Sequence, residues 1–183
     1  MPVISDKEII IQFRDNEQRE SAFRHLMDKY SERLYWHCRR MLISHEDADD
    51  ALQNTLIKVW GNLDSFRADS ELYTWLFRIA TNESLTLIKS RKRHSSGSDN
   101  PEYEMHLAEG LEADPWFDGD QAERKLQQAI LSLPEKQRVV FNLRYFEKMK
   151  YEEMAGILDT SVGALKASHH HAVKKIEKYL LGE

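Results

Sequence analysis

The sequence predicts an all-α protein of two small helical domains, residues 1–93 and 122–183, joined by a flexible acidic linker over residues 94–121. Along both domains, apolar residues recur at steps of three and four, which is the period of a helix buried on one face. The chain has only 7 Gly and 4 Pro among its 183 residues, too few for a turn-rich β architecture. Residues 94–120 hold eight acidic residues, no Lys or Arg and no sustained apolar period, which is typical of a solvated connector.

The net charge of −5 is unevenly distributed. Residues 1–93 hold 15 basic and 15 acidic residues, whereas residues 121–183 hold 11 basic and 8 acidic ones. The acidity therefore lies in the linker, and the overall charge does not argue against nucleic acid as a partner. The single cysteine, Cys38, excludes an intramolecular disulfide and fits a reducing compartment. Because no stretch has the length of a membrane span or the apolar core of a signal peptide, we expect a cytoplasmic protein without membrane insertion.

In the first domain we expect helices over residues 6–15, 18–42, 46–61 and 71–93. In the second of these, the residues spaced for one buried face are Phe23, Leu26, Met27, Tyr30, Leu34 and Met41. In the third, the core candidates are Ala48, Ala51 or Leu52, Thr55, Val59 and Trp60, and the opposite face carries Asp49, Asp50, Gln53, Asn54, Ile57 and Lys58. Such a polar face is either plain solvated surface or a partner site. The apolar Ile57 among polar neighbours is the observation that points to a partner.

The fourth helix and the loop before it combine aromatic and basic residues. They include Phe66, Tyr73, Trp75 and Phe77 beside Arg67, Arg78 and Asn82, and the helix ends in a basic run over residues 89–93. Aromatic rings beside cations suit single-stranded DNA, because bases stack on the rings while the cations neutralise phosphates. The structural alternative is that at least one of Trp75 and Phe77 lies in the core. Basic residues at a helix C-terminus are also favoured by the helix dipole alone.

The second domain is expected to hold helices over residues 122–132 and 134–146, followed by a helix-turn-helix. The core candidates of the first pair are Leu126, Ile130, Leu133, Val139, Val140, Leu143 and Phe146. In the helix-turn-helix, the inward residues are Tyr151, Met154, Ala155 and Leu158, then Val162, Leu165, His169, Ala172, Val173 and Ile176. A polar corner at Asp159 and Thr160 separates the two helices, and Ser161 can cap the second one.

The outer face of the last helix is small, polar and basic. It consists of Gly163, Ala164, Lys166, Ala167, His170, His171, Lys174 and Lys175. The second helix of a helix-turn-helix can enter the DNA major groove with such a face. Periodicity by itself is also compatible with a plain antiparallel helix pair.

The amino-acid sequences of these segments resemble those of bacterial RNA polymerase sigma factors of the extracytoplasmic-function (ECF) group of the sigma-70 family. The C-terminal match consists of Tyr151–Ala155 followed by Ser161–Lys166. The N-terminal match consists of Asp49–Thr55, Leu63–Arg67 and Tyr73–Asn82, in the order and spacing of that family's first domain. The resemblance covers residues 20–93 and 123–180 approximately.

The resemblance implies the partners and the role of each domain. The first domain would dock on the clamp helices of the largest subunit of core RNA polymerase, and would recognise and melt the minus-ten element. The C-terminal domain would recognise the minus-35 element of promoter DNA and contact the flap of the second-largest subunit. An anti-sigma factor is expected as a further partner, whereas no cofactor, no metal and no catalytic residue are expected.

The same resemblance implies the site residues. The polymerase-binding residues would be Asp49, Asp50, Gln53, Asn54 and Ile57; many relatives carry an acid at the position of Asn54. The minus-ten DNA-binding residues would be Phe66, Arg67, Ser70, Tyr73, Trp75, Arg78, Asn82, Arg91, Lys92 and Arg93. The loop over residues 66–72 would hold a flipped base, with Asn82 in its pocket. The minus-35 DNA-binding residues would be Ser161, Ala164, Lys166, Ala167, His170, His171 and Lys174.

The residues also suggest two other functions. A stand-alone helix-turn-helix regulator would use the C-terminal helices alone, and would leave the patterns of the first domain unexplained. A metal-dependent hydrolase would need a ligand set. The three consecutive histidines at residues 169–171 point about 100° apart on a helix, and His45 has no second histidine four residues on, as a zinc-protease motif requires.

Overall fold

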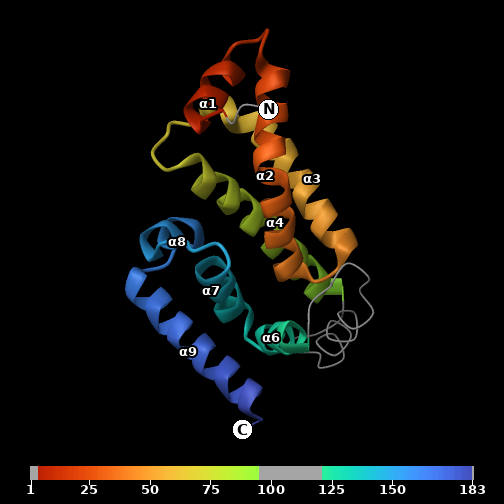
Figure 1. The fold of residues 1–183 in the computed structure, drawn as a ribbon, viewed down its shortest axis with the longest axis vertical. Helices are drawn as coiled ribbons and strands as arrows, with labels where there is room; N and C mark the ends of the chain where they lie inside the picture. The colour runs from red at the N-terminus through yellow and green to blue at the C-terminus, as the bar shows by residue number, and fades with distance from the viewer. Residues whose placement is uncertain (1–3, 95–120, 183) are drawn as a thin grey trace. The chain divides into compact units, whose positions relative to one another are not determined.

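The structure is a computed structural model that describes residues 4–94 and 121–182; within these ranges it is helical, without a β-strand. The chain divides into two compact units, Met1–Ile88 and Lys89–Glu183. The all-α prediction is confirmed (Figure 1). None of the helices in the described ranges is long and apolar enough to cross a membrane.

The N-terminal unit is built around its longest helix, α2, which packs against α1 and α3. Its elements are α1 (Asp6–Arg14), α2 (Arg19–Leu42), α3 (His45–Asn62), the 3-10 turn η1 (Leu63–Ser65) and α4 (Leu72–His94). The predicted helix bounds are therefore confirmed to within about two residues. At the start of α3, the Ser44 side chain accepts a hydrogen bond from the Asp47 amide at 3.4 Å.

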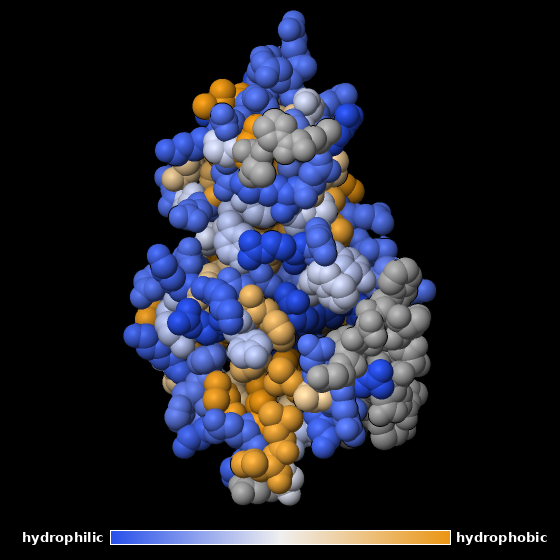
Figure 2. Space-filling view, viewed as in Figure 1, coloured by the Kyte–Doolittle hydropathy of each residue, from blue (hydrophilic) through white to orange (hydrophobic). Residues whose placement is uncertain are grey.

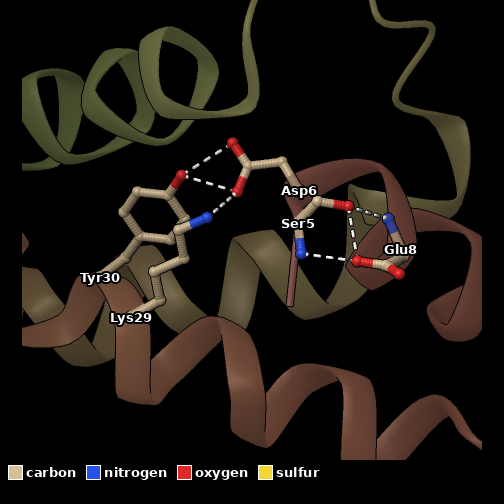
Figure 3. Close-up of polar contacts among 5 residues, drawn as sticks. All are labelled: Ser5, Asp6, Glu8, Lys29 and Tyr30. Carbon is tan, nitrogen blue, oxygen red and sulfur yellow. Dashed lines mark hydrogen bonds and ion pairs between the residues drawn. The ribbon is translucent and has the colours of Figure 1, made fainter. Parts of the chain in front are cut away.

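Polar contacts fix α1 on α2 (Figure 3). Ser5 caps α1 in a capping box with Glu8, whose carboxylate accepts the Ser5 amide at 2.7 Å. The Asp6 carboxylate accepts hydrogen bonds from the Tyr30 hydroxyl at 2.9 Å and from Lys29 Nζ at 2.6 Å. Burial, reinforced by Asp6, raises the pKa of Tyr30, so the phenol remains a neutral donor to Asp6.

Apolar side chains from all four helices form the core of the N-terminal unit. Its buried members include Ile9, Phe13, Leu26, Leu34, Ala48, Ala51, Val59, Leu63, Leu76 and Phe77. Trp60 was expected in this core, but 38 % of it is exposed, and it lies at the rim with its ring edge-on to Phe13 and Phe23. Cys38 is buried inside α2, and burial raises the pKa of its thiol to about 11, so the thiol stays protonated at neutral pH.

The C-terminal unit contains α6 (Gln121–Leu131), α7 (Glu135–Tyr145), α8 (Tyr151–Leu158) and α9 (Val162–Leu181). The last helix packs on the other three. One core cluster is made of Ala129, Ile130, Leu133, Phe141, Ala172 and Ile176. On α8 the buried residues are Met154 and Ile157. Of the four residues predicted to point inward on this helix, Met154 is buried, whereas Tyr151, Ala155 and Leu158 are only partly buried.

Helix α9 runs beyond the predicted stripe and ends at Gly182, whose φ of 74° makes it a left-handed C-cap. The last turn is apolar but unburied: Leu180 is 45 % exposed and Leu181 is 73 % exposed. Figure 2 shows apolar side chains gathered around this end of α9.

Candidate nucleic-acid interface

The predicted corner between α8 and α9 is formed by residues 159–161. Asp159 adopts the left-handed conformation, with φ 48° and ψ 51°. Aspartate tolerates this region better than most non-glycine residues, so the chain turns here without a glycine. Beyond the corner, the Ser161 hydroxyl accepts the Ala164 amide at 3.2 Å, as predicted for an N-cap. These two local features end α8 and begin α9 in the helix-turn-helix arrangement.

The outer face of α9 is open to solvent. The predicted residues Ser161, Ala164, Lys166, Ala167, His170, His171 and Lys174 are all exposed. The short side chains of Ala164 and Ala167 flank Lys166 and allow another surface to approach the helix closely. In this structure Lys166 extends back over α8, with its Nζ 5.7 Å from the centre of the Tyr151 ring. A lysine with several accessible rotamers can swing from the ring to a base edge or a phosphate.

His169 differs from the two histidines that follow it. Its ring stacks on Phe141, with ring centres 6.1 Å apart, and its Nδ1 lies 3.2 Å from the Tyr151 hydroxyl. Burial, together with the charge of Arg144, lowers the pKa of His169, so it stays neutral as a packing residue. This confirms the expectation that His169 faces inward. Among the residues that the structure describes, no group of three His, Cys, Asp or Glu side chains converges as a metal site would require.

A second candidate surface is the outer face of α3. Asp50, Gln53, Asn54 and Ile57 are exposed and Asp49 is partly exposed, as predicted. Ile57, a large apolar residue, is 68 % exposed among these polar neighbours. At one edge of this face, Lys58 pairs with Glu83 of α4. The face is therefore a polar surface that carries one exposed large apolar side chain near its C-terminal end, where a partner could bury it.

The third candidate surface combines the loop over residues 66–72 with α4. Arg67, Ser70, Arg78 and Asn82 are exposed on it, and Arg91 is partly exposed. The side chains of Lys92 and Arg93 lie outside the described residues, as do residues 95–120 of the acidic linker predicted over residues 94–121.

Two aromatic residues of this surface are placed differently from a simple stacking platform. Phe66 is only 6 % exposed and packs on Trp75, with ring centres 5.2 Å apart. In this conformation the Phe66 ring is not available to stack on a base. Instead, it anchors the loop on α4 through Trp75. Phe77 is fully buried, which confirms that at least one of Trp75 and Phe77 is a core residue. Trp75 itself is partly exposed.

Tyr73 contacts a residue, Arg33, that the sequence did not predict as part of this surface. The Arg33 guanidinium, from α2, lies 4.8 Å from the centre of the Tyr73 ring and donates to its hydroxyl at 3.5 Å. The Tyr73 ring also lies against Phe77, with centres 4.3 Å apart. Arg33 adds positive charge to the aromatic part of α4. No local pattern marks Arg33, because the contact spans 40 residues of sequence.

Comparison with known proteins gives matches to both units. The family model "Sigma-70 region 2" matches residues 26–94, and the model "Sigma-70, region 4" matches residues 123–176. The ECF RNA polymerase sigma factor SigW of Bacillus subtilis is 30% identical over 168 residues, covering 88% of this chain and 90% of SigW. The RNA polymerase sigma-H factor of Pseudomonas aeruginosa is 30% identical over 182 residues, covering 96% of this chain and 93% of that factor.

Two solved structures share the fold. The sigma factor RpoE of Bartonella quintana, solved with the anti-sigma factor NepR, has a TM-score of 0.71 and 23% identity, covering 86% of this chain and 96% of RpoE. CnrH, solved with the cytosolic domain of CnrY, has a TM-score of 0.69 and 24% identity, covering 97% of this chain and 98% of CnrH.

Proposed function

This chain belongs to the extracytoplasmic-function group of the sigma-70 family, and from that premise we propose how its three surfaces divide the work of a sigma factor. As a sigma factor it binds core RNA polymerase and directs it to promoters. In the proposal, the outer face of α3 docks on the clamp helices of the largest polymerase subunit. The loop over residues 66–72 and α4 take the minus-ten element, and the outer face of α9 takes the minus-35 element.

The observation that carries the proposal is that both family regions occur in one chain, in order. The first presents two exposed surfaces and the second presents one. The α3 face suits a protein because it is polar around one apolar side chain. The α9 face suits a major groove because its residues are small or basic. The α4 surface suits single-stranded DNA because cations lie beside aromatic rings. None of the three requires catalytic chemistry, so we assign the chain a binding role, in the cytoplasm where polymerase acts.

We further propose that an anti-sigma factor controls this chain, and that the C-terminal unit contacts the flap of the second-largest polymerase subunit. The support for the first is that both solved relatives were captured with a partner, RpoE with the anti-sigma factor NepR and CnrH with the cytosolic domain of CnrY.

Run-off transcription with core RNA polymerase on a genomic library, with mapping of start sites, tests the function. The chain should co-purify with core polymerase, and transcripts that depend on it should start downstream of a shared pair of sequence elements. A chain that binds duplex DNA without core polymerase and yields no transcripts would instead be a stand-alone regulator.

The base-capture assignment predicts that Asn82→Ala impairs promoter melting more than promoter binding. Asn82 is exposed on α4, so its amide is free to face an extruded base. Extruding a base costs a few kcal/mol, which contacts to its edge must offset. One good base-edge contact is worth about 1–3 kcal/mol. Permanganate reactivity of the melted strand should fall about tenfold or more, a factor set by a loss above 1.4 kcal/mol, while closed-complex affinity changes little. Thr86→Ala, exposed one turn further along α4, is the matched control. Undiminished melting by Asn82→Ala would remove Asn82 from the pocket.

The major-groove assignment predicts different behaviour for two exposed lysines of α9. Lys166→Ala should relax selectivity at one or two base pairs by roughly 1–3 kcal/mol, because lysine can donate to guanine O6 and N7. Lys174 has the same charge and lies about two turns further along the helix. Lys174→Ala should weaken binding to every DNA sequence by the same factor. Competition binding against a set of single-base promoter variants, at fixed salt, separates the two. If Lys166→Ala also loses affinity evenly over all sequences, Lys166 is a phosphate contact.

A further inference from the structure

The loop assigned to base capture is held by a helix that lies outside the matched family region. The match to region 2 begins at residue 26, whereas α1 and the first turns of α2 precede it. The Arg14 side chain, in the last turn of α1, donates from Nη2 to the Phe66 carbonyl oxygen at 2.8 Å. This bond joins residues 52 positions apart in sequence. It therefore ties the first residue of the loop to α1, near the N-terminus of the domain.

A second arginine secures the turn just before the loop. Arg19 Nη1 pairs with the Asp64 carboxylate at 2.7 Å, and its guanidinium lies 4.4 Å from the centre of the Phe13 ring. The same guanidinium lies 5.0 Å from the centre of the Trp60 ring. Arg19 thus ties η1 to the aromatic rim of the core. These contacts of Arg19 all lie outside the loop over residues 66–72. The contact to that loop is the hydrogen bond from Arg14 to the Phe66 carbonyl oxygen.

The helix from which the Arg14 side chain extends is held in place by packing and by polar contacts. Ile9 and Phe13 of α1 are fully buried, and the capping box with the Asp6 contacts to Lys29 and Tyr30 fixes the start of the helix (Figure 3). A side chain that leaves the end of a fixed helix loses less conformational entropy when it forms a hydrogen bond than one on a mobile segment.

The loop needs such support because its backbone is strained. Ala68, two residues after the bonded carbonyl, has a φ of 59°, which an alanine rarely adopts. Residues in this region persist only when the surroundings hold them there, and they concentrate at ligand-binding loops. With Phe66 buried on Trp75 and its carbonyl bonded to Arg14, the chain enters Arg67 and Ala68 from a fixed point.

We propose that Arg14 is a positioning residue for base recognition: it holds the loop over residues 66–72 in the conformation that captures the flipped base, without touching DNA itself. This inference rests on the proposed function of that loop. It extends the recognition device from the matched region to α1. Its consequence is that a variant at Arg14 changes which base is accepted, and does not merely weaken DNA binding.

The experiment uses the full chain bound to core RNA polymerase. The probes are fluorescent single-stranded oligonucleotides with the minus-ten element mapped from this chain's own transcripts, in four versions that differ at the base the wild type discriminates best. Arg14→Met removes the donor but keeps an unbranched apolar stem, and Arg14→Lys keeps a charged donor. Arg24→Met, an exposed arginine of α2, is the control for loss of charge. Thermal unfolding of each variant is recorded in parallel.

Arg14→Met should reduce the preference for the correct base about three- to tenfold, a change of roughly 1 kcal/mol expected for one charge-assisted hydrogen bond. Arg14→Lys should restore most of the preference, and Arg24→Met should retain it. The salt dependence of binding should not change. If Arg14→Met weakens all four probes equally with a salt slope shallower by about 0.7, Arg14 is a phosphate contact and the proposal is wrong.

Two further outcomes separate this inference from the function on which it rests. A wild type that discriminates bases while Arg14→Met discriminates equally well overturns only the role of Arg14. A wild type that shows no base preference overturns the base-capture function, and the inference with it. If Arg14→Met unfolds at a lower temperature, Arg14→Lys decides: restored stability without restored base preference would make Arg14 a merely structural residue.

Discussion

Ile57→Asp is expected to lower the affinity of the chain for core RNA polymerase by at least about tenfold, while the stability of the N-terminal unit changes little. The Ile57 side chain is 68 % exposed on the polar α3 face, so the folded chain loses almost no packing when it is replaced. Surface substitutions of this kind usually change stability by about 0.5 kcal/mol or less. An apolar side chain that a complex buries is desolvated, so a charge in its place is costly. The few residues that dominate an interface cost about 2 kcal/mol or more when they are truncated.

The chain offers a matched control for this experiment. Ile11 on α1 is 67 % exposed, so Ile11→Asp makes the same chemical change at the same exposure on a different surface. A titration of core polymerase with labelled chain should show the loss for Ile57→Asp and wild-type affinity for Ile11→Asp. The double variant Asp50→Arg with Gln53→Ala, on the same face as Ile57, should weaken binding too. Equal affinities for both isoleucine variants would place the polymerase contact elsewhere.

The helices of this chain are predictable from the sequence because their signals are local. Apolar periodicity over two or more turns fixes the buried face, and Ser5, Ser44 and Ser161 mark helix starts by capping. The exposed faces of α3 and α9 follow from the same periodicity, since they are its complement. Errors of one position, such as Leu158 for Ile157 on the short α8, arise because eight residues give too few turns to set the angle of the stripe.

The sequence could not show what happens where distant segments meet. Phe66 lies in a polar loop, and nothing local indicates that its ring is buried on Trp75. The contacts of Arg14 with Phe66 and of Arg33 with Tyr73 span 52 and 40 residues. Such pairs depend on how helices pack, which periodicity leaves undetermined. The loop over residues 66–72, for which we propose base capture, is therefore the part of the candidate site for which the structure adds most.

A buried histidine, His37, is expected to make the N-terminal unit less stable in acid. His37 of α2 is fully buried against Phe77, and its Nε2 lies 2.9 Å from the Thr81 hydroxyl of α4. Burial, with a smaller contribution from Arg40, lowers the pKa of His37 to about 3. In the unfolded chain a histidine titrates near pH 6.5. Between these two values the unfolded state binds the proton and the folded state does not, so the stability present above about pH 6.5 is lost as the pH falls toward 3.

The expected loss is large for a single side chain. A full proton difference gives a slope of about 1.4 kcal/mol per pH unit, so the free energy of unfolding should fall by roughly 2–3 kcal/mol between pH 7.5 and 4.5 on account of His37. Other groups titrate in the same range, and only a comparison with a variant isolates this contribution. The variant His37→Leu with Thr81→Val replaces both partners by apolar groups, because either change alone would leave a buried polar atom without its partner.

Urea unfolding followed by tryptophan fluorescence at pH 7.5, 6.0 and 4.5 measures the difference. Three of the four tryptophans, Trp36, Trp60 and Trp75, lie in the N-terminal unit and report on it. The double variant should lose less stability than the wild type on acidification, with the gap widening to roughly 2–3 kcal/mol at pH 4.5. His171→Leu, an exposed histidine of the other unit, should leave the wild-type curve unchanged. Parallel curves for the wild type and the double variant would mean that His37 accepts a proton in the folded chain as readily as in the unfolded one. The contact between α2 and α4 would then not depend on a neutral imidazole.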